Sequence, residues 1–109
     1  MDSVSQHKDL FESWKKESLP YQMGNIGSEV SRAIKNRDKP KRFQGAFERA
    51  LELFDLTIEC LKGDLEKKGA LREVCRAREE FCDYFNGNSF NTDAKKMQRY
   101  YDQFALIRK

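Results

Sequence analysis

Apolar and polar residues follow each other along the chain with the period of an amphipathic α-helix, not with the strict alternation of a β-strand. The clearest case is segment 43–62, where apolar positions three and four residues apart share one helical face and a second apolar line follows another side. A helix that is apolar on two sides needs a neighbour on each. The pattern therefore predicts that 43–62 is the central helix of a bundle, and Gly63 directly after it favours termination there.

The same period predicts further helices on both sides of this segment. They cover about 4–16, about 20–37, about 70–85, and a last stretch from a cap at Asn91 or Thr92 to about 107. Ser18 and Pro20 mark the second start, because serine caps helices and proline is tolerated in the first turn. We predict an all-α fold, a four- to five-helix up-down bundle with residues 1–109 forming a single domain.

The net charge of +3 is unevenly distributed. Residues 1–42 carry 9 basic and 6 acidic groups, residues 43–83 carry 7 and 10, and residues 84–109 carry 5 and 2. The acidic middle and basic ends either help the ends to dock on the middle or display a basic surface to a polyanion. Within the first basic segment, residues 35–42 form a basic linker, for which a solvated loop is the simplest interpretation.

The chain lacks the residue sets on which most catalytic and metal sites depend. Its only histidine is His7, and its cysteines, Cys60, Cys75 and Cys82, have no CxxC spacing. A metal site or an activated nucleophile would lack its usual partners, so we expect no cofactor and interpret the thiols as buried packing residues. The sequence contains neither a membrane span nor a signal-peptide pattern, so we expect a cytoplasmic protein with no membrane partner.

Arg78 interrupts the apolar stripe of the fourth predicted helix. Because a guanidinium keeps its charge, it needs a carboxylate partner or water. Two interpretations stay open: Arg78 pairs with a carboxylate, most simply on the central helix, or several arginines line an anion pocket between helices. The candidate cluster consists of Arg78, Arg32, Arg49, Arg72, Arg76, Glu29, Glu48, Glu52 and Asp55.

Two further features favour a contact surface. Gly24 and Gly27 lie one turn apart in the second helix, where each costs up to about 1 kcal/mol relative to alanine. We therefore expect another backbone to come close to them. Tyr100 and Tyr101 of the last helix are suited to a core, to a dimer interface or to stacking on unpaired bases. The candidate interface is Gly24, Gly27, Tyr100 and Tyr101.

Three blocks, IGSEVSRAI (26–34), AFERALELFDLTIE (46–59) and LREVCRAREEFCDYF (71–85), carry a resemblance. In them the chain resembles a family of small uncharacterised prokaryotic helical-bundle proteins, and its layout is loosely similar to the HEPN and nucleotidyltransferase-substrate-binding group. HEPN ribonucleases use an Arg-x4–6-His motif, and no arginine here is followed by a histidine. The resemblance thus implies an inactive or binding member that works as a dimer or beside a partner protein.

From these features we expect a non-enzymatic protein that acts through protein association, as a homodimer or with a partner protein. The alternative is an RNA- or DNA-binding module that uses the basic end segments. A hydrolase acting through Arg78, Asp55 and Glu29 is disfavoured, because such residues occur at helical spacing on any charged bundle.

Overall fold

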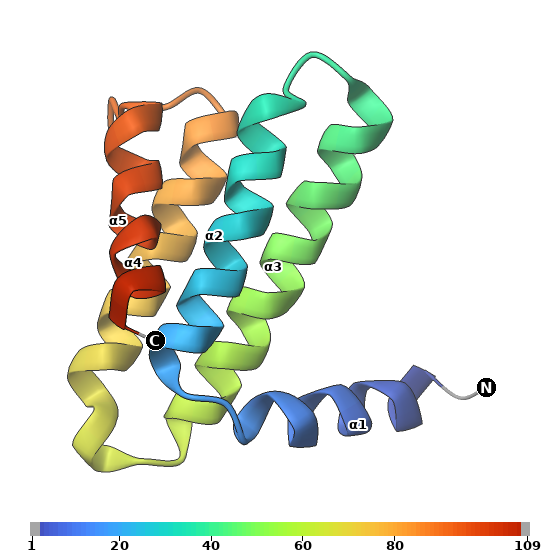
Figure 1. Ribbon diagram of the computed structural model, residues 1–109, viewed down its shortest axis with the longest axis vertical. Helices are drawn as coiled ribbons and strands as arrows, with labels where there is room; N and C mark the ends of the chain where they lie inside the picture. The colour runs from blue at the N-terminus through green and yellow to red at the C-terminus, as the bar shows by residue number, and fades with distance from the viewer. Residues whose placement is uncertain (1–2, 108–109) are drawn as a thin grey trace.

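The computed structural model describes the backbone of residues 3–107 and the side chains of residues 9–107, and the regular elements in this range are all helical (Figure 1). They are α1 (Ser3–Lys15), α2 (Leu19–Lys35), α3 (Pro40–Lys62), the short 3-10 helix η1 (Leu65–Lys67), α4 (Lys68–Phe85) and α5 (Ala94–Ile107). Helices α2 to α5 alternate in direction and lie side by side, whereas α1 lies across one end (Figure 1). The predicted all-α up-down bundle is confirmed. His7 lies outside the described side chains.

Helix α3 has neighbours on both of its apolar sides. It packs against α2 and α4, and α1 contacts it as well. Its buried residues come from both predicted lines: Ala50 and Phe54 from the first, and Ala46 and Leu56 from the second. The period of the sequence was therefore sufficient to predict a helix with two packing surfaces.

Aromatic rings join three of the four bundle helices. The ring centroid of Phe54 on α3 lies 5.8 Å from that of Phe81 on α4 and 6.4 Å from that of Tyr101 on α5. Such pairs contribute about 0.5–1.5 kcal/mol each beyond the burial of their area. Helix α2 adds fully buried aliphatic side chains, chiefly Ile26 and Val30.

The predicted cap of the last helix is wrong. Helix α5 begins at Ala94, and the Oδ1 atom of Asp93 accepts a hydrogen bond from the backbone N–H of Lys95 at 2.8 Å. Asn91 instead takes a left-handed backbone conformation with φ 53° in the preceding loop. Asn, Thr and Asp are all good capping residues, so their order alone could not identify the one used. At the start of α2, Ser18 Oγ does accept from the Tyr21 N–H, as expected.

Of the two glycines at which a close approach was expected, Gly27 has one, and the element that makes it is α5 of the same chain. A Cβ atom added to Gly27 would lie 2.5 Å from Cβ of Tyr101, which real Cβ atoms essentially never do. Both residues are buried. The absence of a side chain at Gly27 therefore sets how near α5 can come to α2.

We predict that Gly27→Ala destabilises the fold by about 1–3 kcal/mol, because α5 must move to make room. This cost exceeds the gain of up to about 1 kcal/mol in helix propensity. Urea denaturation of the two proteins measures the difference. Gly63→Ala is the matched control: its added Cβ meets no atom within 4 Å, so its stability should stay equal or rise. Equal stabilities for Gly27→Ala and Gly63→Ala would contradict the proposed contact.

Candidate functional site

The charged cluster predicted from the sequence is divided among different surfaces of the bundle. Glu29, Arg32 and Arg49 meet between α2 and α3, Asp55 and Arg78 meet between α3 and α4, and Arg72 and Arg76 line a groove between α4 and α5. Glu48 and Glu52 are exposed on α3, where Glu48 accepts a hydrogen bond from Gln44. Residues two apart on a helix point about 200° apart, so Arg76 and Arg78 cannot share a pocket. The arginines do not form one anion site.

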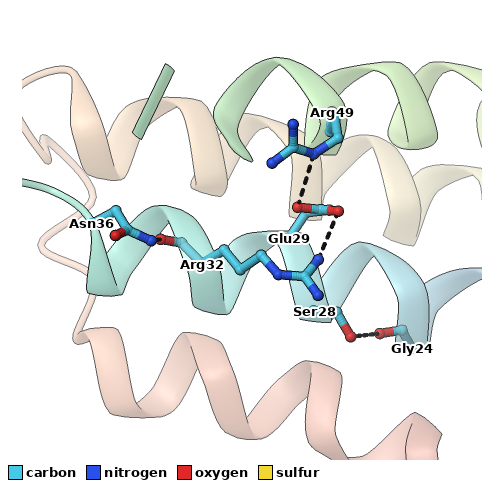
Figure 2. A network of polar contacts seen from close by, with 6 residues as sticks. All are labelled: Gly24, Ser28, Glu29, Arg32, Asn36 and Arg49. Carbon is cyan, nitrogen blue, oxygen red and sulfur yellow. Dashed lines mark hydrogen bonds and ion pairs between the residues drawn. The ribbon is translucent and has the colours of Figure 1, made fainter. Parts of the chain in front are cut away.

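The first surface is built on Glu29, a largely buried carboxylate shared by two helices. Figure 2 shows it between Arg32 Nη1, 2.9 Å away on α2, and Arg49 Nε, 3.3 Å away on α3. The two arginine side chains remain 59% and 58% exposed, so water screens the pairs and each contributes at most about 1 kcal/mol. This contact helps to align α2 with α3, and it occupies both arginines.

The second surface is formed by Arg78, for which the sequence left open either an ion pair or an anion pocket. Its Nε atom lies 2.9 Å from Oδ1 of Asp55 on α3, the helix from which a partner was expected. The two side chains are 35% and 61% exposed, so a contribution of about 0.2–1 kcal/mol is the appropriate magnitude. Arg78 therefore lies in a half-exposed ion pair that aligns two helices.

The third surface is a groove of about 480 Å³ between α4 and α5. It contains Arg72 and Arg76, but also the carboxylates of Glu73 and Glu80. Tyr100 donates its hydroxyl hydrogen to Glu73 Oε1 at 2.8 Å, and burial together with this hydrogen bond raises the pKa of Tyr100 far above its usual value. The phenol stays protonated and acts as a fixed donor, so the groove has mixed charge and no activated nucleophile.

The remaining candidate interface residues are used within the chain. Gly27 and Tyr101 are buried against each other, and Gly24 lines a shallow groove of about 340 Å³ between α2 and α5. The cysteines are half-buried and free, and burial raises the pKa of the Cys60 and Cys82 thiols. Both therefore remain protonated and unreactive at neutral pH.

Exposed basic residues from two distant segments lie together at one end of the bundle. Because α2 to α5 alternate in direction, the α2–α3 connection, the α4–α5 loop and the first turn of α5 lie at the same end (Figure 1). We call this end, residues 35–42 and 83–99, the basic end. Its exposed cations are Lys35, Arg37, Lys39, Lys41, Arg42, Lys95, Lys96 and Arg99. Against these 8 stand 3 acidic residues, whereas the rest of the chain has 13 basic and 15 acidic residues.

Two of the three acidic residues of the basic end, Asp83 and Asp93, bind the backbone of the α4–α5 loop and of the start of α5. Asp83 accepts hydrogen bonds from the N–H and hydroxyl of Ser89 and from the N–H of Phe90, which lower the pKa of Asp83. Asp93 caps α5. Within residues 9–107, none of the eight cations takes part in an ion pair with a carboxylate. The positive charge of this end is therefore not neutralised locally.

The sequence identified the two basic segments but did not show that they lie at the same end of the bundle. Lys35, the last residue of α2, and Gln98 of α5 line the same groove, so the end of α2 lies beside the first turns of α5. The predicted linker 35–42 is longer than the connection itself, because α2 extends through Lys35 and α3 begins at Pro40. That neighbourhood depends on which helices pack together, which the helical period does not encode. Phe90, 58% exposed in the α4–α5 loop, was also missed, because an aromatic residue in a short loop carries no signal of its exposure.

A scan against protein-family models, a search of curated proteins and a search of solved structures each find no match. The resemblance to HEPN proteins remains a prediction. In the part of the chain that the structure describes, no group of three or more His, Cys, Asp or Glu side chains is placed to hold a metal ion. Between residues 3 and 107, no helix combines the length and apolar character needed to cross a membrane.

We predict that Asp83→Asn lowers the thermal midpoint at neutral pH and loses this effect in acid. Because the pKa of Asp83 lies below its unfolded value of 3.8, its stabilisation is present above about pH 4 and disappears as the pH falls through the folded pKa. Thermal unfolding at pH 7, 4 and 2.5 measures the gap between the variant and the parent, which should close with acidity. Asp38→Asn, which removes a carboxylate from the same end without removing a hydrogen bond, is the control. A gap for Asp83→Asn that is constant with pH would contradict this role.

Proposed function

We propose that the protein acts through association of its own chains, with α1 as the contact element. The observation that supports this is the placement of α1, which extends away from the bundle instead of packing along it (Figure 1). Its attachment is at its C-terminal end, where Trp14 Nε1 donates to Thr57 Oγ1 at 2.8 Å and the Trp14 carbonyl accepts from Gln22 Nε2 at 2.8 Å. Among the described side chains of α1, Asp9, Leu10 and Glu12 are exposed.

An amphipathic helix of this size needs an apolar surface to pack against. Isolated helices shorter than about 12–15 residues are marginal in water, and α1 has 13 residues. Yet Leu10, on its apolar side, remains 48% exposed. Burial of that side by a partner would stabilise both the helix and the contact.

A second copy of the chain provides a suitable partner. Where α1 meets α3, a groove of about 430 Å³ has an apolar part, formed by Phe11, Leu19, Cys60 and Leu61, and a charged rim that includes Lys15 and Lys67. Two copies related by a two-fold axis would each offer the same helix and the same groove, so the apolar side of each helix could pack on the apolar part of the other copy's groove. This reciprocity favours a homodimer over a monomer in which the apolar side of α1 stays exposed.

Light scattering coupled to size exclusion tests the proposal across a dilution series. We expect the parent protein to reach twice the monomer mass at tens of micromolar, and Leu10→Glu to raise the midpoint of dissociation at least about tenfold. The reason is that an unpaired carboxylate in an apolar contact costs more than about 1.4 kcal/mol.

Leu65→Glu is the matched control, because it makes the same change at a leucine that is 83% exposed on η1. It should leave the midpoint unchanged. A parent protein that stays monomeric at all concentrations, or equal effects of the two substitutions, would disprove association through α1.

A further inference from the structure

We propose that the basic end binds single-stranded nucleic acid, with its cations on the phosphates and Phe90 stacked on a base. This inference goes beyond association and does not depend on it. Helix α1 contacts the C-terminal half of α3 through Thr57, whereas the basic end lies at the N-terminus of α3 (Figure 1). The two surfaces are at opposite ends of the bundle.

Positive charge is concentrated at the basic end. The basic end carries eight exposed cations and three acidic residues, and two of those, Asp83 and Asp93, are engaged in backbone hydrogen bonds. Uncompensated cations spread over neighbouring helix ends match a phosphate backbone, which carries a charge at every nucleotide. A small anion would need only one or two of them.

Two of these cations also lie at the start of α3. The N-terminus of a helix carries a partial positive charge and stabilises a bound anion. The first turn of α3 contains no acidic residue and carries Lys41 and Arg42, and its N-cap residue, Lys39, makes no side-chain capping hydrogen bond. At α5 the cations Lys95 and Lys96 follow the capping carboxylate of Asp93. A phosphate bound at the start of α3 would contact both the cations and the uncapped backbone N–H groups.

An aromatic side chain is exposed in the α4–α5 loop at the same end of the bundle. Phe90 is 58% exposed, and its backbone N–H donates to Asp83 at 2.9 Å, which helps to fix the loop that carries it. At this end the guanidinium of Arg37 also lies 5.0 Å from the ring centroid of Tyr84. Exposed aromatic rings and stacked guanidinium groups are the platforms on which unpaired bases lie.

These features favour a single strand over a duplex. Recognition in the major groove needs a helix or a two-stranded ribbon that projects from the protein. The described part of the basic end instead consists of two short connections and the ends of four helices packed side by side (Figure 1). We therefore expect unpaired bases to stack on Phe90 while their phosphates contact the helix ends.

Fluorescence anisotropy with labelled 12-nucleotide RNA and DNA strands of mixed sequence, at several salt concentrations, tests the proposal. Each lost phosphate contact should reduce the slope of log K against log salt by about 0.7. The double variant Lys39→Gln/Lys95→Gln, with one change in each basic segment, should therefore reduce it by about 1.4. Lys62→Gln/Lys68→Gln replaces two exposed lysines at the opposite end and is the matched control. It should leave the slope of log K against log salt unchanged. Absence of binding by the parent protein at low salt, or equal effects of the two variants, would overturn the proposal.

A second pair of measurements separates nucleic acid from other polyanions. Phe90→Ala should weaken oligonucleotide binding at least about fivefold through lost stacking, and leave heparin binding unchanged because heparin has no bases. Tighter binding of heparin or polyglutamate than of the oligonucleotide, or no effect of Phe90→Ala, would assign the surface to an acidic partner and overturn the proposal.

The role of the cations at the start of α3 can be measured separately. Lys41→Gln/Arg42→Gln should weaken oligonucleotide binding while raising the thermal midpoint by about 2–4 °C, because two cations leave the positive end of α3. A lower thermal midpoint together with unchanged binding would show that these residues stabilise the fold and do not bind phosphate.

Discussion

The contact between Gly27 and Tyr101 is the constraint on which the arrangement of the bundle depends. It lets α5 lie close against α2, and it brings Tyr101 to Phe54 in the core. It also fixes what lies at the ends of these helices. Because α5 runs antiparallel to α2, its basic first turn lies at the same end of the bundle as the basic segment at the end of α2 and the start of α3. The same contact that closes the core therefore assembles the basic end.

The charged residues of the chain fall into two groups with different roles. Along the sides of the bundle, Glu29 and Asp55 pair with arginines across neighbouring helices. These pairs are partly exposed, so their main effect is to align helices and not to add much free energy. At the basic end the cations lack such partners, and at the start of α3 they oppose the helix dipole. The first group is explained by the fold, and the second is the group to which we assign a ligand.

The helical period predicted the elements well, because burial on one side of a helix leaves a direct trace in the sequence. It also predicted that Gly27 meets another backbone and that Arg78 pairs with the helix now identified as α3. The helical period did not predict which side of a helix a charged residue occupies, nor which helices pack against each other. The candidate arginines were grouped without regard to the side of α4 on which each lies, so Arg76 and Arg78 were placed together. The basic end was missed as a unit because its two segments are some fifty residues apart in sequence.

The central claim is that the middle of the bundle serves packing while its two ends serve binding. Amide chemical shifts followed by nuclear magnetic resonance during titration with a single-stranded oligonucleotide test it most directly. The account predicts saturable shifts in residues 35–42 and 86–99, and none in residues 9–15 of α1 at constant protein concentration. Shifts centred on the groove between Arg72 and Tyr100, or spread evenly over the charged sides of the helices, would contradict it.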